Sequence, residues 1–500
     1  MKRIPTRLPL LVCTLVLFGL YFARHASENP TRHETYVKPI PPIRRPVVQE
    51  HLEVEEPRSP EPVEPVAPFV DNAFRVPPVT WKAFPPETNV VTHAPGWTVF
   101  DNVYALNGTL FVVTSNPLTI PDLKFIISTG IPLLHGKDQP AKRLPTDREI
   151  RVITPMQASS LFGDSAVRLS GPSWLVNDPN QYIPHYYHWA AELFLGLWRA
   201  YASLALDFTP DGRTSLPPPS RLIFTRISPN EWRDPALLNP WMTRAAFPSL
   251  SMEFEDDWTD RSQTHRPYMF ERLLVADRSA AEHGESFKKT WRTASQAFEL
   301  SASKYFWEPV RRNVLDFSGL AAEWVNGPNP GALHRRQQFV VTYISRQGWG
   351  RRELLQEHHE RLVHELMKLK NQFGIEVNVA EMDKLTRAQQ FQLAGRTTIM
   401  MGVHGNGLTA LLWMRPTPQS TVIEFFCPEG LAFDYEYTTR ALGMVHYGVW
   451  NDEIFTRPNV PQWPNYPEDF QGTDIPLNGG VVAELVKHRL GLDENDDTYR

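Results

Sequence analysis

The chain has 500 residues, a formal net charge of −5 at pH 7 and two cysteines. This length predicts two or three domains with well-packed cores. The mildly negative charge gives no electrostatic support for a nucleic-acid partner, and none is expected.

The N-terminus predicts a membrane anchor. Three basic residues precede an uncharged apolar stretch at 8–23, the pattern of a signal peptide or of a short spanning helix. The flank at 22–26 fits a cleavage site poorly, so an uncleaved type II anchor is preferred over a cleaved signal and a secreted protein. Residues 1–7 are then a cytoplasmic tail, and the body faces the lumen of the endoplasmic reticulum or Golgi.

Other features are compatible with a lumenal body. Cys13 lies in the apolar stretch, so Cys427 has no partner within the chain, and a large domain in an oxidising lumen can do without disulfides. Asn107-Gly108-Thr109 is a glycosylation acceptor. Residues 24–95 are rich in Pro, Glu and Val, which predicts a disordered, extended stem and no packed core.

An N-terminal domain is expected at 96–326. Strand patterns occur at 97–114, 123–129, 221–227 and 272–276, and helical patterns occur from Pro184 and at 288–314. Gly and Pro then cluster at 327–331, which indicates an interdomain linker.

The C-terminal domain, at 335–455, alternates regularly between strand and helix patterns. Strands are predicted at 338–345, 375–380, 398–403, 421–426 and 446–450, and helices at 351–374, 386–396, 408–414 and 433–444. Such alternation predicts a parallel sheet whose ligands bind beyond the carboxyl ends of the strands. Residues 456–500 are expected to pack back on the body.

A glycine-rich turn, His404-Gly405-Asn406-Gly407, follows one of these strands. Its glycines allow a ligand to approach the backbone, and the free N–H groups at a helix start favour an anion such as phosphate. The alternative is a structural turn that needs positive φ angles.

Charged residues follow or occupy neighbouring strands. Arg346, Arg351 and Arg352 lie where a strand ends and a helix is predicted to begin; guanidiniums there oppose the helix dipole, which argues for a bound anion. Glu424 stands inside an apolar strand. It is expected either to accept hydrogen bonds from ribose hydroxyls or to pair with one of the arginines.

A third group lies in the helix pattern that begins at Pro184. His188 and Glu192 are four residues apart and share a helix face, an arrangement suited to a general base. His185 lies on nearly the same face and is assigned to the acceptor side. A metal site on these three residues is conceivable but lacks further ligands, and a packing or capping role is the plainer alternative.

Several catalytic motifs are absent from the sequence. The His-Glu-x-x-x-His run at 359–364 is one residue longer than the zinc-protease motif, and there is no Gly-x-Ser-x-Gly elbow and no Walker A motif. No Asp-x-Asp pair occurs either. A metal is therefore not expected, and arginines are expected to stabilise the leaving group instead.

The second domain resembles glycosyltransferase family 61. The resemblance rests on Ser345-Arg346, Arg351-Arg352, Gln390, the run from Gly402 to Leu408, and Glu424, with His188-Trp189 and Glu192 matching the family's first-domain helix. Asn406, Ala410 and Gln356 depart from the usual pattern. The resemblance covers roughly 180–450.

The resemblance implies an α/β protein of GT-B type, in which two Rossmann-like domains face a cleft. It further implies a UDP-sugar donor, inversion at the anomeric carbon and no essential metal or other cofactor. The expected protein is a type II membrane glycosyltransferase that moves a sugar, xylose or N-acetylglucosamine, to a glycan or glycoprotein hydroxyl. The alternatives are a non-catalytic lumenal glycan-binding protein on the same fold and, more distantly, a secreted hydrolase.

The expected site residues follow from these assignments. The catalytic groups are His188, Glu192 and His404, and the donor and phosphate ligands are Arg346, Arg351, Arg352, Gly405, Asn406, Gly407 and Glu424.

Overall fold

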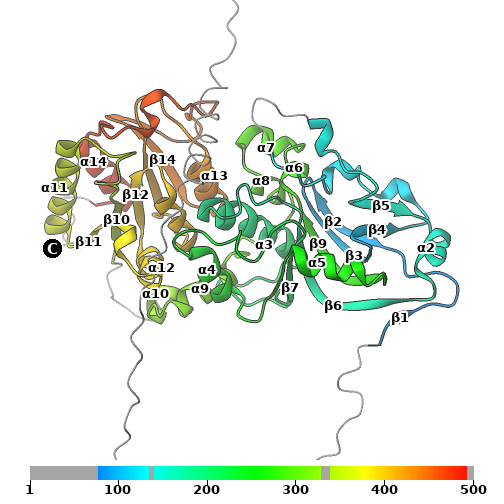
Figure 1. Ribbon diagram of the computed structural model, residues 1–500. Coiled ribbons are helices and arrows are strands. Elements are labelled where there is room, and N and C mark those ends of the chain that lie inside the picture. The colour runs from blue at the N-terminus through cyan, green and yellow to red at the C-terminus, as the bar shows by residue number, and fades with distance from the viewer. Residues whose placement is uncertain (1–76, 134–139, 328–337, 493–500) are drawn as a thin grey trace, which may run out of the picture. The chain divides into compact units, whose positions relative to one another are not determined.

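The computed structural model describes residues 77–133, 140–327 and 338–492 (Figure 1). The predicted cytoplasmic tail, the membrane anchor and most of the stem lie outside these ranges, as does most of the linker predicted at 327–331. Within the described ranges, no helix combines the length and the apolar character needed to cross a membrane. The two sheets described below lie in one compact unit, Pro78–Arg500.

The first sheet is mixed, with nine strands among the described residues. Its order is β5-β4-β3-β9-β6-β7-β8, with β1 paired to β6 and β2 to β3. Strands β9, β6, β7 and β8 run parallel, whereas β3 is antiparallel to β2, β4 and β9. The strand bounds are β1 Val79–Thr80, β2 Asn89–Ala94, β3 Trp97–Leu106, β4 Thr109–Val113, β5 Ile150–Ile153, β6 Ser165–Val176, β7 Arg221–Phe224, β8 Ser251–Glu253 and β9 Tyr268–Ala276.

The second sheet has the parallel order that the alternating sequence predicts. Its order is β11-β10-β12-β13-β14-β15, and only the pairing of β14 with β15 is antiparallel. Every residue of β10, β12 and β13 is buried, as expected for inner strands covered on both faces. The bounds are β10 Val340–Ile344, β11 Glu376–Ala380, β12 Ile399–Val403, β13 Thr421–Phe425, β14 Val445–Trp450 and β15 Glu453–Phe455.

Helices join the strands of both sheets. The α-helices are α2 Pro155–Phe162, α3 Leu195–Ala202, α4 Leu238–Ala246, α5 Glu255–Gln263, α6 Arg278–Ala281, α7 Glu285–Thr290, α8 Ala294–Ala297, α9 Glu308–Phe317, α10 Ala322–Asn326, α11 Gln356–Phe373, α12 Arg387–Arg396, α13 Asp434–Ala441 and α14 Gly479–Leu490. The 3₁₀ segments are η1 Pro117–Thr119, η2 Leu123–Phe125, η3 Pro140–Arg143, η5 Met382–Lys384, η6 Asn406–Trp413 and η7 Glu468–Gln471, and η4 His188–Phe194 is a π-helix.

Several elements differ from the sequence prediction. Strands begin at Val79, so residues 77–95 are not part of a disordered stem. The strand predicted at 123–129 is absent, and the short η2 stands there instead, with the Asp122 side chain accepting from Lys124 N–H. Helix α11 begins at Gln356, five residues later than predicted. The segment after the glycine-rich turn is 3₁₀ and not α.

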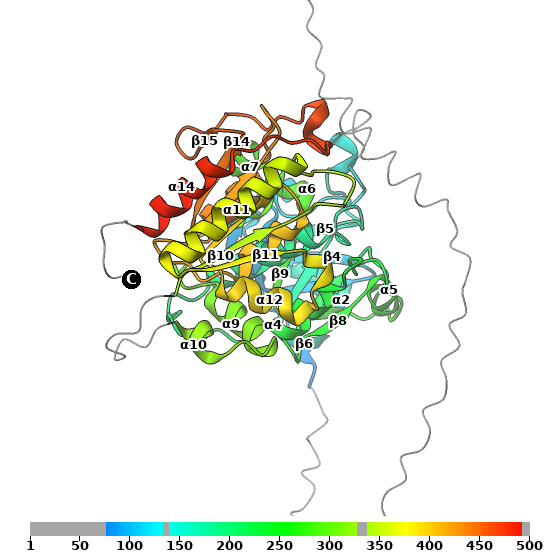
Figure 2. The ribbon, with the colours of Figure 1, turned by 90° about the vertical axis from the view of Figure 1, so that its left-hand side faces the viewer.

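Helix α14 lies beside α11, as Figure 2 shows in red and yellow-green. A Cβ on Gly479 would lie 2.7 Å from Cα of Leu362, so the glycine permits close contact between the two helices. Val482 and Val486 of α14 share a buried cluster with Leu362 and Leu366 of α11. This apolar contact holds the C-terminal segment on the body.

A tryptophan-rich core connects the π-helix region with η6. Trp413 donates from its indole to the hydroxyl of Tyr186, at 3.0 Å, and Trp307 donates to the carbonyl of Leu412, at 2.7 Å. Trp189 and Trp413 belong to the same buried cluster. The Trp413–Tyr186 bond joins η6 to the residues just before the π-helix, and the Trp307–Leu412 bond joins η6 to the start of α9. These bonds and the shared cluster fix the helix that carries His188 relative to the turn that carries His404.

Candidate active site

The turn after β12 has a glycine with a steric role. Gly405 has a φ of 166°, which is extended backbone, so the chain conformation itself does not require glycine. A Cβ on Gly405 would, however, lie 2.7 Å from Nη1 of Arg346. The glycine therefore leaves room for a guanidinium beside the backbone.

Arg346 and Arg352 both contact this turn. Arg352 donates from Nη1 to the carbonyl of His404, at 3.4 Å, and from Nε to Oε1 of Gln471, at 2.9 Å. The Arg346 guanidinium lies over the Trp349 ring, 4.9 Å from its centroid. Its buried Nε has no hydrogen-bond partner in the described part of the chain.

These two guanidiniums lack a counter-ion among the described residues, since neither forms an ion pair with a carboxylate there. Burial, together with repulsion from Arg352 and Arg351, lowers the pKa of Arg346 to about 10. Burial also lowers the pKa of Arg352. Two partly buried cations without a protein anion are suited to bind an anionic ligand.

Glu424 of β13 contacts two histidines, His404 of the turn and His446 of β14. Its Oε1 lies 2.5 Å from Nδ1 of His404, and its Oε2 lies 2.8 Å from Nε2 of His446 in β14. Burial raises the pKa of Glu424 well above its usual range, and Asp434 and Glu436 act in the same direction. Burial lowers the pKa of His446 to about 4.

This histidine bridge corrects the expectation for Glu424. The side chain is fully buried and both of its oxygens already have partners. A side chain without exposed surface is not positioned to contact a ribose hydroxyl, and within the described residues Glu424 forms no ion pair with an arginine. It acts on the site through His404.

His188 and Glu192 form a second group, on the π-helix. Nδ1 of His188 lies 2.5 Å from Oε2 of Glu192, with 23% of the histidine side chain exposed and 2% of the glutamate. The shared helix face predicted from their spacing is confirmed. π-Helical turns occur frequently at functional sites.

Two arginines hold the Glu192 carboxylate. Arg278 donates to Oε2, at 3.0 Å, and Nη1 of Arg292 lies 3.8 Å from Oε1. Burial by itself raises the pKa of Glu192, but Arg278, His188 and Arg292 outweigh it and hold the pKa well below its usual range. An ionised Glu192 accepts from the Nδ1–H of His188, which leaves Nε2 of that ring free to take a proton.

Asp434 and Tyr435 connect the two groups. Nη1 of Arg292 lies 2.7 Å from Oδ1 of Asp434, and the Tyr187 hydroxyl donates to the Asp434 carbonyl, at 2.9 Å. The adjacent Tyr435 ring lies 5.4 Å from the His404 ring, centroid to centroid. The base candidate and the arginine-lined turn thus belong to one connected site.

Residues 186–423 match the family model described as Glycosyltransferase 61. This region belongs to glycosyltransferase family 61. The match includes both the π-helix and the arginine-lined turn and ends one residue before Glu424. No curated protein matches the chain. The family predicted from the motifs is confirmed over this region, and the family's description indicates a glycosyltransferase.

The family's Arg-Arg pair does not open a helix here. Arg351 and Arg352 precede the first residue of α11, and Arg352 has a φ of 53°. The prediction that they oppose a helix dipole is wrong, so that argument for an anion fails. Arg346 and Arg352, which lack counter-ions among the described residues, still support a bound anion, whereas Arg351 is exposed.

The other two residues of the turn have local roles. The Asn406 side chain accepts from the Thr409 hydroxyl, at 3.2 Å, within its own 3₁₀ segment. A Cβ on Gly407 would lie 3.0 Å from Cγ2 of Ile344. Gly407 therefore faces the end of β10, whereas Gly405 faces the Arg346 guanidinium.

His185 and the metal alternative can be placed as well. The His185 ring centroid lies 5.0 Å from that of His188, and the side chain is exposed. The described residues contain no group of three His, Cys, Asp or Glu side chains that could hold a metal ion. His185 thus lies next to the base candidate, on the accessible side.

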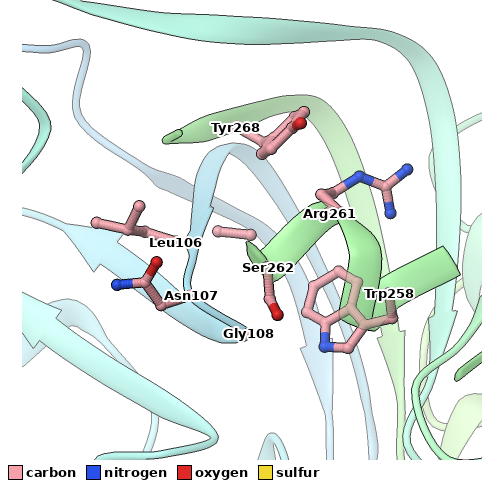
Figure 3. Close-up of a pocket in the computed structure, with 8 residues that line it drawn as sticks. Leu106, Asn107, Gly108, Trp258, Arg261, Ser262 and Tyr268 are labelled. Carbon is pink, nitrogen blue, oxygen red and sulfur yellow. The ribbon is translucent and has the colours of Figure 1, made fainter. Parts of the chain in front are cut away.

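Asn107 lies in the turn of the β3–β4 hairpin of the first sheet. Asn107 and Gly108 have φ angles of 51° and 82°, which fit a type I′ turn. The Asn107 side chain is exposed and contacts Nδ1 of His265 through Oδ1, at 2.9 Å. A small cavity beside it is lined by Trp258, Arg261 and Ser262 of α5 and by Tyr268 (Figure 3).

Sequence reasoning missed several residues of the site, namely Arg278, Arg292, Asp434, Tyr435 and His446. Only His446 had a usable signal. Parallel pairing of β13 with β14 places Glu424 opposite Gly448, and side chains two residues apart share a sheet face. Pairing these two predicted strands would have placed His446 near Glu424.

Proposed function

We propose that this family 61 protein is an inverting, metal-independent glycosyltransferase that moves xylose or N-acetylglucosamine from a UDP-sugar to a hydroxyl of a glycan or glycoprotein. The observation that supports it most directly is the pair of guanidiniums, Arg346 and Arg352, that contact the His404–Gly405 turn without a protein counter-ion. A nucleoside diphosphate has the charge and the oxygens to occupy that place.

In this proposal the reaction is a single displacement. Nε2 of His188 takes the proton of the acceptor hydroxyl while Glu192 holds the ring and stabilises the imidazolium. The acceptor oxygen attacks the anomeric carbon from the face opposite the diphosphate, and the bond from that carbon to the diphosphate oxygen breaks. Arg346 and Arg352 stabilise the charge that grows on the departing UDP.

The organisation proposed with this activity is of GT-B type. Residues 335–455 hold the donor and residues 96–326 hold the acceptor. The second sheet supports this division, because the arginine-lined turn lies at the carboxyl end of β12, where open parallel sheets bind their ligands. We further propose a single-pass type II protein with a lumenal body; extraction of the protein by carbonate would contradict the anchor.

The test of the activity is donor hydrolysis. A transferase without acceptor is expected to hydrolyse its UDP-sugar slowly, whereas a glycan-binding protein releases no UDP. A thermal-shift screen of UDP-sugars first selects the donor. Hydrolysis is expected to persist in EDTA, since arginines supply the charge; activity lost on chelation and restored by a divalent ion would contradict the metal-independent proposal.

The two glycines of the turn give a matched pair of variants. Gly405→Ala places a methyl group against the Arg346 guanidinium, so we expect UDP affinity to fall about 10-fold while the melting temperature changes little. Gly407→Ala presses on Ile344 instead, so we expect a loss of about 1–3 kcal/mol in stability with near-normal UDP affinity in the folded protein. Calorimetry and thermal melts on the same preparations measure both. Equal UDP affinities for the two variants would remove Arg346 from the donor site.

A further inference from the structure

Glu424 shares its carboxyl group between two histidines and, in the part of the chain that the structure describes, forms no ion pair with a lysine or an arginine. Oε1 contacts Nδ1 of His404 and Oε2 contacts Nε2 of His446, at 2.5 and 2.8 Å. The side chain is 0% exposed, and within the described residues its ion-pair partners are these two rings. An ionised carboxylate in such surroundings is costly.

Glu424, His404 and His446 together can hold either two or three protons. With two protons, a carboxylate accepts from Nδ1–H of His404 and from Nε2–H of His446, the group is negative, and Nε2 of His404 is a bare acceptor. With three protons the group is neutral. Nε2 of His404 then carries a proton, whichever side of the 2.5 Å contact the shared proton occupies. Burial favours the neutral arrangement.

The contacts of the His446 ring indicate which oxygen of Glu424 carries the carboxyl proton. Its Nδ1 is buried without a hydrogen-bond partner in the described part of the chain. A bare nitrogen there costs less than an N–H without an acceptor, so the ring proton belongs on Nε2, where it donates to Oε2. The carboxyl proton is left on Oε1 and donates to Nδ1 of His404.

We propose that Glu424 is a protonated acid held in place by His446, a positioning residue, so that His404 offers an Nε2–H donor and not a base to the anion site. This inference rests on the proposed function. An Nε2–H donor beside Arg346 and Arg352 stabilises the departing diphosphate, while proton removal from the acceptor belongs to His188.

The surrounding charges agree with this arrangement. Asp434 and Glu436 add to burial in raising the pKa of Glu424, while Arg352 and Arg292 oppose them. Burial, with repulsion from Arg352, Arg292 and Arg346, holds the pKa of His404 well below its usual range. The ring therefore stays neutral, and the shared proton stays on the acid.

Nitrogen-15 NMR of histidine-labelled full-length protein tests the proton assignment without any sugar donor. The His404 signals are identified by their loss in His404→Asn. We expect a neutral ring with its proton on Nε2, in the wild type and in Glu424→Gln, whose amide can donate to Nδ1 and accept from His446. A bare Nε2 in the wild type would overturn the proposal, whether or not the protein transfers sugar.

Kinetic measurements then distinguish a protonated Glu424 from an ionised one. If Glu424 is protonated, Glu424→Gln should keep kcat within about 5-fold, the effect of one ordinary hydrogen bond. If His404 were instead a base held by an ionised Glu424, the amide of Glu424→Gln would favour the wrong tautomer of His404. The value of kcat would then fall by up to about 10⁴-fold, as it does when the aspartate of a serine-protease triad becomes asparagine. A loss of that size, with an unchanged melting temperature, would contradict the acid assignment.

Two variants test the positioning role of His446. His446→Leu removes the donor to Oε2, so we expect kcat to fall about 10-fold with an unchanged KM for acceptor. His446→Gln keeps an N–H donor and should recover most of that loss. Equal kcat values for the two variants would overturn the role of His446. If His446→Leu does not fold, the His404 signal in His446→Gln decides, and loss of its Nε2 proton there overturns the proposal.

Discussion

Replacing His188 with alanine is expected to lower kcat for sugar transfer by roughly 10²–10⁴-fold, the usual contribution of a positioned general base. Nε2 of His188 is the atom of the pair that can reach an acceptor, because Nδ1 contacts Glu192 and 23% of the histidine side chain is exposed. The fold should persist, since Glu192 keeps its bond to Arg278. UDP affinity should change little, because the donor site lies on other residues. Initial rates at saturating donor and acceptor, with calorimetry for UDP, measure both.

His364→Ala is the matched control for this prediction. His364 is exposed on α11, away from the site, so its loss should leave kcat and UDP affinity unchanged. A His188→Ala enzyme with wild-type kcat would remove His188 as the base. A fall in melting temperature large enough to explain the lost activity would instead support the packing role that the sequence left open.

The second sheet could be predicted closely from the sequence, and the first could not. Strands β10 to β14 are short apolar runs separated by helices, so each has a local signal and the alternation dictates parallel order. In the first sheet β3 pairs with β9, about 170 residues later, as the Asp101–Arg272 pairing shows. No local pattern encodes such a partner. The apolar run at 123–129 has the composition of a strand, but only the short η2 forms there.

The site was predictable wherever its contacts are local. The spacing of His188 and Glu192 fixes a shared helix face, and the end of a parallel strand locates the His404–Gly405 turn. The charges that set the state of Glu192 come from Arg278 and Arg292, which are 86 and 100 residues away in the chain. Whether a buried carboxylate is ionised depends on such distant cations.

The presence or absence of distant arginines distinguishes two glutamates that look alike in the sequence. Glu192 and Glu424 are both buried, and each has a histidine within 2.5 Å. Glu192 also has two arginines and is held ionised, whereas Glu424 has a second histidine and tends to keep its proton. The proposed roles of His188 as base and His404 as donor follow from these partners and not from the histidines themselves.

Replacing Arg346 with lysine is expected to weaken UDP binding by at least ~10-fold. Lysine keeps the charge but loses the planar fork that can contact two phosphate oxygens at once, and a charge-assisted contact is worth about 1.5–3 kcal/mol. The variant should fold normally, because Arg346 has no ion pair among the described residues and its buried Nε has no partner there. Removing such a group relieves burial of a cation and costs little.

Arg361→Lys, on the exposed face of α11, is the control for the same chemical change. Calorimetric titration with UDP compares the two variants with the wild type. Raising the salt concentration should reduce the difference in UDP affinity between Arg346→Lys and the wild type, because the contact is electrostatic. If Arg346→Lys binds UDP as tightly as Arg361→Lys, the guanidinium beside Gly405 is not a phosphate ligand. Arg352 alone would then remain as a phosphate ligand, and its bonds to Gln471 and to the His404 carbonyl already occupy part of its guanidinium.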